Sequence, residues 1–294
     1  MKRYFLFPLL IFVVSSTIEP NVAMARKPMR LICYNIADGM WYDQYNRYDR
    51  FVAWAIAQNP DVFALCEAAT HWNEHRRTVP ADEMPRYLPD SLSQLAARWG
   101  HRYIAVGPYQ DNYPVAITSK RPIRVIQRLG GTGLSHGALH VQIDGINYVV
   151  LHLWPHKYSK DDPTRRDNHG DIYRLGEIQR ILDSTILNSC FAAEKHWMMM
   201  GDFNVPSPVD SAYLGSKNYD VHTLIRNVYP HDIIAEQHPG VFIPSVVKGN
   251  KRIDFVYCTD ELFKSVIRAE IPVDAFTDVA SDHRPVLIEF LKSQ

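Results

Sequence analysis

The chain has 294 residues, of which 46% are hydrophobic, and its 32 basic and 32 acidic side chains give a formal net charge of zero. This length and hydrophobic content exclude a small domain and allow one large two-layered domain with a sizeable core. Proteins that grip long nucleic acid without sequence preference usually carry a positive excess, so the balanced charge argues against that class without excluding a nuclease.

Residues 1–25 have the features of a secretory signal peptide. Lys2 and Arg3 form a basic start, an apolar run follows over residues 5–14, and Ala23-Met24-Ala25 supplies a small-x-small cleavage pattern. A membrane anchor is the alternative, but the apolar run is short for a bilayer. We expect cleavage after Ala25, a single domain over residues 26–294, secreted or periplasmic location, and no stable membrane insertion.

Strand-like apolar runs recur along the whole chain, some alternating with polar residues and others wholly apolar, as in central strands. Asp144-Gly145 lies between two of them and is typical of a hairpin turn. The expected strands, in chain order, are 29–36, 62–66, 103–106, 115–119, 123–129, 138–143, 146–152, 197–200, 254–258, 265–270 and 286–291.

Helical patterns lie between these runs at 48–58, 91–99 and 171–187, with a shorter one near 211–213. The first ends at Asn59-Pro60, a helix stop signal, and the third carries an apolar stripe at helical spacing. Many strands with few helices predict an α/β fold in which two sheets pack face to face and helices cover the outside. Two long irregular segments, 71–89 and 155–170, have the length of functional loops.

Four cysteines occur, at Cys33, Cys66, Cys190 and Cys258. An exported protein can pair them, but three of the four lie inside strand-like runs, which favours buried free thiols. The sequence leaves the disulfide state open.

Polar residues follow several of the predicted strands. Asn35 ends the first strand and Glu67 follows the second. Each is separately explained as a strand-end cap, but neighbouring strands can also deliver such oxygen ligands to one sheet edge. Mg²⁺ prefers a few carboxylates together with water and substrate phosphate.

His152 ends a later strand, and a histidine in this place is often structural. The spacing to His156 allows a zinc site, although Pro155 argues against the helix that would put both rings on one face. Donation of a proton or hydrogen bond to a phosphoryl oxygen suits His152 better.

Two further motifs carry acids and a histidine. Gly201-Asp202-Phe203-Asn204 places a carboxylate that can take a proton from water beside an amide that can bind a phosphate oxygen. Asp254 and His283 are a candidate dyad, because a carboxylate fixes the tautomer of an imidazole and stabilises its charged form. Asp282, next to His283, is a candidate metal ligand.

Gly-Asp-Phe-Asn at 201–204, Arg-Ile-Asp-Phe-Val-Tyr at 252–257 and Ser-Asp-His-Arg-Pro-Val at 281–286, in this order, resemble the endonuclease/exonuclease/phosphatase superfamily. The resemblance is to its deoxyribonuclease I-like members, in an exported bacterial form, and runs from about residue 29 to 291. It implies a four-layer α/β sandwich made of two mixed sheets flanked by helices.

The resemblance also implies roles for the individual residues. Glu67 would be the principal Mg²⁺ ligand, aided by Asn35 and Asp282. Asp202 would position or deprotonate the attacking water, Asn204 would hold the phosphate, and Asp254 would orient His283 against the scissile phosphate. His152 would take the place of a second active-site histidine.

Three positions depart from the family pattern. Cys66 stands where members often have Gln before the metal-binding Glu, and His136 lies in a segment that often carries Arg. No carboxylate partner for the first histidine is evident near Asp111-Asn112-Tyr113. These departures leave the substrate open.

Other residues near the motifs have two readings. Arg165 and Arg166 suit phosphate binding, but pairing with nearby aspartates in a solvated loop explains them more simply. The remaining aromatics either stack on a base or sugar or simply pack; they are Trp41, Tyr42, Trp154 and Tyr158.

We expect a secreted, Mg²⁺-dependent phosphoric ester hydrolase of phosphodiesterase or endonuclease type that uses in-line attack by water, with Mn²⁺ as a possible substitute ion. Its substrate would be nucleic acid or a small or lipid phosphodiester. A phospholipid or sugar-phosphate phosphatase of the same superfamily is the alternative. An inert binding protein on this scaffold and a zinc hydrolase are less favoured, and no oligomeric state is predicted.

Overall fold

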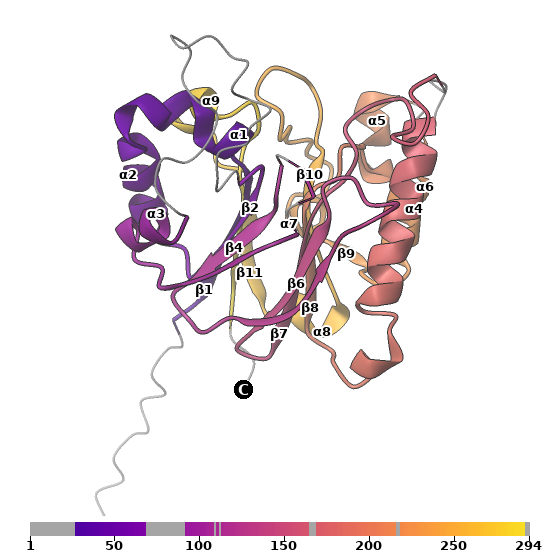
Figure 1. Cartoon of the computed structure of the whole chain (residues 1–294), viewed down its shortest axis with the longest axis horizontal. Coiled ribbons are helices and arrows are strands. Elements are labelled where there is room, and N and C mark those ends of the chain that lie inside the picture. The colour runs from indigo at the N-terminus through magenta and orange to yellow at the C-terminus, as the bar shows by residue number, and fades with distance from the viewer. Residues whose placement is uncertain are drawn as a thin grey trace, which may run out of the picture.

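The computed structural model describes residues 27–68, 92–108, 110–111, 113–164, 169–215 and 218–291. The predicted signal peptide and the irregular segment 71–89 lie outside these ranges. Two six-stranded mixed sheets pack face to face, with helices on both outer faces (Figure 1). The four-layer α/β sandwich expected from the sequence is confirmed.

The first sheet has the order β11-β12-β1-β2-β4-β3. Its central strands β1 and β2 are parallel, with Asn35 opposite Cys66 at their carboxyl ends, and the other neighbours are antiparallel. The strands are β1 (Met29–Asn35), β2 (Val62–Cys66), β3 (Tyr103–Val106), β4 (Ala116–Ser119), β11 (Val266–Glu270) and β12 (Val286–Phe290).

The second sheet has the order β5-β6-β7-β8-β10-β9 and repeats this plan. Its parallel pair is β7 and β8, whose ends place His152 opposite Asp202, while β8 and β10 run antiparallel with Asp254 opposite Asp202. The strands are β5 (Arg124–Leu129), β6 (Ala138–Ile143), β7 (Ile146–His152), β8 (Trp197–Asp202), β9 (His231–Asp232) and β10 (Asp254–Cys258).

The main core lies between the two sheets. One face of every strand except β9 contributes to it, for example Leu31 and Cys33 from β1, Val150 from β7 and Met198 and Met200 from β8. These residues alternate in sequence because successive side chains of a strand point to opposite faces. The predicted strand patterns therefore follow from burial in this layer.

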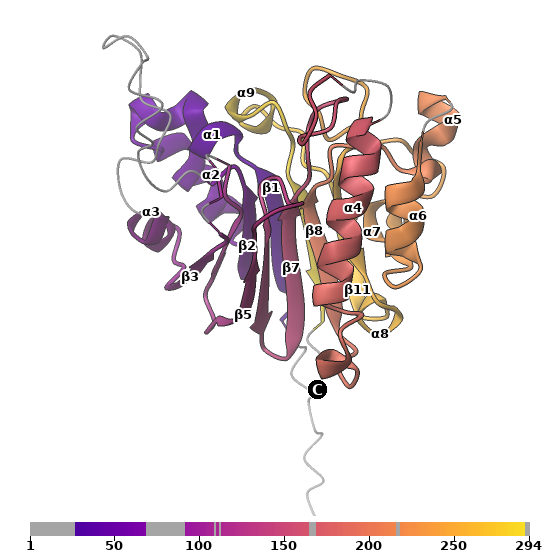
Figure 2. The ribbon, with the colours of Figure 1, turned by 45° about the vertical axis from the view of Figure 1, so that its right-hand side comes forward.

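Two further apolar clusters join the outer faces of the sheets to their helices. Helices α2 and α3 cover the first sheet, and α4 and α6 cover the second (Figure 2). The helical segments are α1 (Ala37–Met40), η1 (Trp41–Asn46), α2 (Asp49–Gln58), α3 (Leu92–Arg98), α4 (His169–Ser184), η3 (Ser189–Phe191), η4 (Pro208–Asp210), α5 (Ser211–Leu214), α6 (Asp220–Arg226), α7 (Ile233–Gln237), α8 (Asp260–Phe263) and α9 (Thr277–Ala280).

Several element bounds differ from those expected. β8 continues past residue 200 to Asp202, because pairing with both β7 and β10 extends it through Gly201. α4 ends at Ser184, short of the predicted residue 187, because the backbone N–H groups of Thr185 and Leu187 both bond to the carbonyl of Leu182. All four cysteines are free thiols, and in the described ranges no helix meets the length and hydropathy needed to cross a bilayer.

Candidate active site

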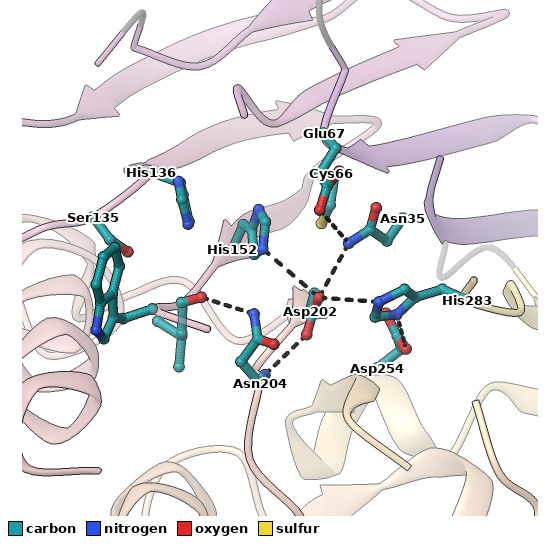
Figure 3. A network of polar contacts seen from close by, with 12 residues as sticks. Asn35, Cys66, Glu67, Ser135, His136, His152, Asp202, Asn204, Asp254 and His283 are labelled. Carbon is teal, nitrogen blue, oxygen red and sulfur yellow. Dashed lines mark hydrogen bonds and ion pairs between the residues drawn. The ribbon is translucent and has the colours of Figure 1, made fainter. Parts of the chain in front are cut away.

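The carboxyl ends of the two parallel strand pairs meet at one edge of the sandwich. They deliver Asn35 and Glu67 from the first sheet and His152 and Asp202 from the second (Figure 3). The loop before β12 adds His283 to the same place, and the hydroxyl of Ser281 in that loop donates to the backbone carbonyl of Asn35, 2.8 Å away. Sequence segments more than 200 residues apart therefore share one polar pocket.

Asp202 lies at the centre of this group and is only 1% exposed. Its Oδ2 atom is 3.1 Å from Nδ2 of Asn35 and 3.7 Å from Nε2 of both His152 and His283. Burial, with the nearby charge of Asp254, raises the pKa of Asp202 to about 7, although the charge of His283 opposes the shift. A carboxylate whose pKa is near neutrality suits proton transfer from water.

His283 is paired with Asp254, and its surroundings favour the positively charged form of its ring. Its Nδ1 is 2.8 Å from Oδ2 of Asp254, which also accepts a hydrogen bond from the Ser245 hydroxyl at 2.6 Å. Burial lowers the pKa of His283, but the charges of Asp254 and Asp202 outweigh it and hold that pKa well above its usual value. His283 is therefore an imidazolium at neutral pH.

His152 has the opposite electrostatic character. Burial, together with the charges that His136 and His283 can carry, holds the pKa of His152 well below its usual range. The two histidines that flank Asp202 therefore differ in protonation state: one is cationic and one is neutral. Such divergence between neighbouring titratable groups is typical of acid and base roles.

Glu67 and Asn35 lie on the side of the site formed by the first sheet. Glu67 takes a left-handed backbone conformation (φ 55°), and its two carboxylate oxygens accept from the backbone N–H of Asp38 at 2.8 Å and from Nδ2 of Asn35 at 3.2 Å. Burial raises the pKa of Glu67 despite these bonds. The amide oxygen of Asn35 accepts from the backbone N–H of Ala37, so this side chain presents its nitrogen to the carboxylates.

Glu67 and Asp282 line a cavity of about 170 Å³ together with aromatic side chains. Three acidic residues, Asp38, Glu67 and Asp282, line this cavity. Carboxylates suit a hard divalent cation, which binds through oxygen and keeps several waters. These residues fit Mg²⁺; the assignment of Asn35 as a ligand stays a prediction, since its oxygen is engaged elsewhere. The cavity is lined by Ala37, Asp38, Trp41, Tyr42, Glu67 and Asp282.

Asp202, Asp254 and His283 form another group that can ligate a metal. One ligand atom from each lies within 4.8 Å of the others, and no other such group of three occurs in the described ranges. Nδ1 of His283 and Oδ2 of Asp254 also bond to each other. The site therefore offers two adjacent positions with metal-ligand character, one of which was absent from the sequence prediction.

Asn204 follows Asp202 on a left-handed turn (φ 54°). Its backbone N–H donates to Oδ1 of Asp202 at 2.9 Å, and its Nδ2 donates to the carbonyl of Leu153 at the same distance. One side-chain N–H of Asn204 is thus used within the protein. Only the second is left for a phosphate oxygen.

The structure adds polar partners that the sequence analysis did not identify. The sequence showed no evident carboxylate partner for His152 near residues 111–113. In the structure Asp111 does contact a histidine, but that histidine is His136 rather than His152. Glu177 on α4 accepts hydrogen bonds from Ser135 and from the backbone of Trp154. Neither pairing has a sequence signal, because the partners are separated by 23 to 42 residues and belong to different elements.

The aromatic residues near the site divide into two kinds. The indole of Trp154 donates to the carbonyl of Tyr158 at 2.6 Å, and the two rings meet edge to face, so these two pack within their own loop. Trp41 and Tyr42 instead line the cavity beside Glu67. Arg165 and Arg166 lie outside the described residues.

Comparison with models of known protein families assigns this chain to one of them. The model of the endonuclease/exonuclease/phosphatase family matches residues 34–283. The chain belongs to this family. Members of the endonuclease/exonuclease/phosphatase family hydrolyse phosphoric ester bonds, which supports an enzymatic role for this member.

Solved structures share the fold of this family member at low sequence identity. An AP endonuclease from Archaeoglobus fulgidus has 17% identity and a TM-score of 0.65, covering 89% of this chain and 99% of its own. A 3'-5' exonuclease from Neisseria meningitidis has 16% identity and a TM-score of 0.57, with the same coverages. A Beutenbergia cavernae endonuclease/exonuclease/phosphatase has 18% identity and a TM-score of 0.61, covering 91% of this chain and 72% of its own. A search of curated proteins gave no significant match.

Proposed function

We propose that this chain is a divalent-metal-dependent hydrolase of phosphoric diesters, with endonuclease-type or related phosphodiesterase activity. One observation carries the proposal. A buried carboxylate, Asp202, whose pKa is raised to about 7, lies between a cationic and a neutral histidine and close to a carboxylate-lined cavity. Water activation, charge stabilisation and cation binding are thereby available within one pocket.

Asp202 is the proposed general base. Its Oδ2 atom is the common neighbour of both histidines, and burial together with the charge of Asp254 favours the protonated carboxyl that forms when Asp202 takes a proton from water. The imidazolium of His283, held by Asp254, offers a positive charge to the phosphate oxygens as negative charge develops. His152 can orient a phosphate oxygen or the attacking water without adding charge.

The carboxylates of Glu67 and Asp282 would hold the cation. A bound Mg²⁺ supplies neutralisation of the phosphate charge, and Mn²⁺ has similar ligand preferences. Asn35 links the two halves of the site, because its amide bonds to both Glu67 and Asp202. These ties hold the proposed metal-binding side and the proposed base at a constant separation.

The choice of substrate rests on separate grounds. One structural neighbour from Neisseria is described as a 3' phosphatase bound to a product DNA hairpin, and two others are nucleases by name, which favours a nucleic acid substrate. The zero net charge favours a small or lipid-derived phosphodiester, because long polyanions are usually bound by a basic surface. We therefore keep this second class as the alternative.

We further propose that the chain is exported and that residues 1–25 are removed as a signal peptide. The motivating pattern is the basic start, the short apolar run and Ala23-Met24-Ala25. Mass spectrometry of the protein recovered outside the cytoplasm should find an N-terminus at Arg26. A mature chain that still begins at Met1 would contradict this.

A substrate panel tests the catalytic proposal. Plasmid DNA, RNA, sphingomyelin, inositol phosphates and a chromogenic diester are each incubated with the purified protein, with and without EDTA, and then with added Mg²⁺ or Mn²⁺. We expect hydrolysis of at least one diester, its loss with EDTA and its return with the ion. Asp202→Ala should abolish turnover, whereas Asp260→Asn, at a carboxylate that is 72% exposed, should not. Turnover by Asp202→Ala at the wild-type rate would refute the assignment.

A further inference from the structure

A third histidine lies beside the site and has no part in the mechanism above. The rings of His136 and His152 are stacked, with centroids 4.2 Å apart and planes inclined by 26°. Figure 3 shows His136 on the opposite side of His152 from His283, with Asp202 between His152 and His283.

The two nitrogens of His136 have different surroundings. Nδ1 is 2.6 Å from Oδ2 of Asp111, so this nitrogen carries a proton toward the carboxylate. Nε2, on the other side of the ring, is buried and has no hydrogen-bond partner in the part of the chain that the structure describes, and the whole residue is 4% exposed. Other buried side-chain atoms of the described residues also lack a partner, but Nε2 of His136 belongs to a ring stacked on a histidine of the site. A substrate oxygen at this place would satisfy it.

The position of His136 is imposed by its neighbours. The backbone and hydroxyl of Ser135 both donate to Oε1 of Glu177, and the backbone N–H of Trp154 donates to Oε2 at 2.9 Å. This one buried carboxylate on α4 therefore ties the loop that carries His136 to the loop that follows His152. On the other flank, Gly137 has a φ of 83°, and a Cβ there would lie 2.4 Å from the ring of Pro108.

We propose that His136 binds a non-bridging phosphoryl oxygen of the substrate through Nε2, and that Asp111 is its positioning residue. The proposal rests on the proposed function, since it names a further substrate contact in the same site. Because Nδ1 donates a hydrogen bond to Asp111, a second donation from Nε2 to a phosphate oxygen requires that both ring nitrogens carry a proton. Asp111 and Glu177 bring negative charge near this ring. Lys160, which donates to the carbonyl of Ser135, brings positive charge, and the neutral ring of His152 adds none. No covalent bond forms or breaks in this contact.

A purely structural role is the competing explanation. On that view His136 only packs against His152, and substitution would alter folding or the placement of His152. The two explanations differ in the quantity that changes. Loss of a contact to a phosphate oxygen that forms in both the bound substrate and the transition state raises KM and leaves kcat nearly unchanged, whereas a displaced His152 would lower kcat.

Two substitutions of His136 test the roles of its two ring nitrogens separately. In His136→Asn the amide can still donate toward Asp111 but nothing replaces Nε2; in His136→Gln the longer amide can place a donor where Nε2 was. We expect His136→Asn to raise KM for the substrate identified in the panel by about tenfold, the effect of one charge-assisted hydrogen bond. His136→Gln should recover most of this loss, and Asp111→Asn should raise KM by a smaller factor.

Binding of inorganic phosphate provides a readout without turnover. The ring nitrogens of the wild-type protein, labelled with ¹⁵N-histidine, are followed by NMR while phosphate is added. We expect Nε2 of His136 to shift toward the value of a protonated nitrogen, with a weaker apparent affinity in Asp111→Asn and an unchanged one in Asp260→Asn. Circular dichroism of each variant establishes that it is folded, and the wild-type titration stands even if a variant does not fold.

The outcomes distinguish this inference from the proposed function. If the wild-type protein cleaves no phosphoric ester but phosphate still shifts Nε2 of His136, the contact stands and the proposed function fails. If esters are cleaved while His136→Asn has the wild-type KM and phosphate leaves the His136 signals unchanged, the contact is refuted and the proposed function survives. A fall in kcat with unchanged KM in His136→Asn would also overturn the contact in favour of the packing role.

Discussion

The buried carboxylate of Asp202 is kept for function at the expense of stability. Its pKa in the folded protein is about 7, whereas the ordinary value is 3.8. The folded state therefore holds this proton more tightly than the unfolded state, and the contribution of Asp202 to stability falls as the pH rises from about 4 to 7. A side chain that cannot ionise would escape this loss.

We expect Asp202→Asn to lower turnover by a factor of about 10² to 10⁴, the usual contribution of a general base. The melting temperature of this variant minus that of the wild type should be larger at pH 8 than at pH 5, because only the wild type loses stability over this range. Scanning calorimetry at both pH values measures the difference, with Asp49→Asn as the control, because this carboxylate is 73% exposed and pairs with Arg98, which stays charged at both pH values. An equal difference at pH 5 and pH 8 would show that ionisation of Asp202 does not strain the fold.

The paired histidine and carboxylate also set the pH profile. Asp202 must be ionised to accept a proton, so kcat/KM should rise through a midpoint near pH 7 and level off about one pH unit higher, or at lower pH when a bound cation favours the carboxylate. The alkaline limb should lie well above 6.5, because the pKa of His283 is raised. His283→Gln should lose that limb along with most activity, and a profile for this variant identical to that of the wild type would contradict the role of His283.

At the scale of elements, the close approach of β7 and β8 positions the site. Gly201 has a φ of 144°, and a Cβ at this residue would lie 1.8 Å from the backbone oxygen of Leu151. The next residue of each strand is a site residue, His152 and Asp202, in direct register. Any widening of the strands at Gly201 therefore separates these two side chains.

We expect Gly201→Ala to destabilise the fold by about 2–4 kcal/mol and to reduce activity in the fraction that folds. Gly176→Ala is the matched control, since a Cβ there meets nothing within 4 Å and Gly176 lies inside α4. Replacing glycine in a helix interior should stabilise the protein by about 0.5–1 kcal/mol. Urea unfolding followed by circular dichroism compares the two, and similar midpoints for both variants would contradict the steric argument.

At the scale of the whole molecule, carboxylates from both sheets converge on a single pocket. Glu67 and Asp282 line the cavity, and Asp202 and Asp254 lie deeper in the site. Their mutual repulsion in a buried setting favours a bound cation, which would link the two sheets thermodynamically as well as catalytically.

Mg²⁺ should therefore stabilise the wild-type protein. At a concentration one hundred times its dissociation constant, a ligand specific for the folded state contributes about 2.7 kcal/mol. We expect a corresponding rise in melting temperature for the wild type, a much smaller rise for Glu67→Gln, and an undiminished rise for Glu261→Gln, which alters an exposed carboxylate on α8. A rise of the same size in Glu67→Gln would place the ion elsewhere.

The sequence did not predict several short elements, nor the seven-residue helix α6. β9 has two residues, and α7, α8 and α9 have four or five each, too few for a periodic pattern to emerge. β9 exists because His231 and Asp232 pair with the end of β10. Its conformation is decided by a neighbour that lies more than 20 residues away in sequence.

Local pattern by itself determined the strands of the sandwich other than β9 and the placement of polar residues at their ends, because burial on a pleated sheet imposes an alternation of apolar and polar residues along each strand. The tertiary structure alone decided which of those ends meet. It paired Asp111 with His136, turned the amide nitrogen of Asn35 toward two carboxylates and gave His152 and His283 opposite protonation states. The physical reason is that burial and the electric field at a side chain depend on all elements packed around it, and these properties have no counterpart in the order of residues along the chain.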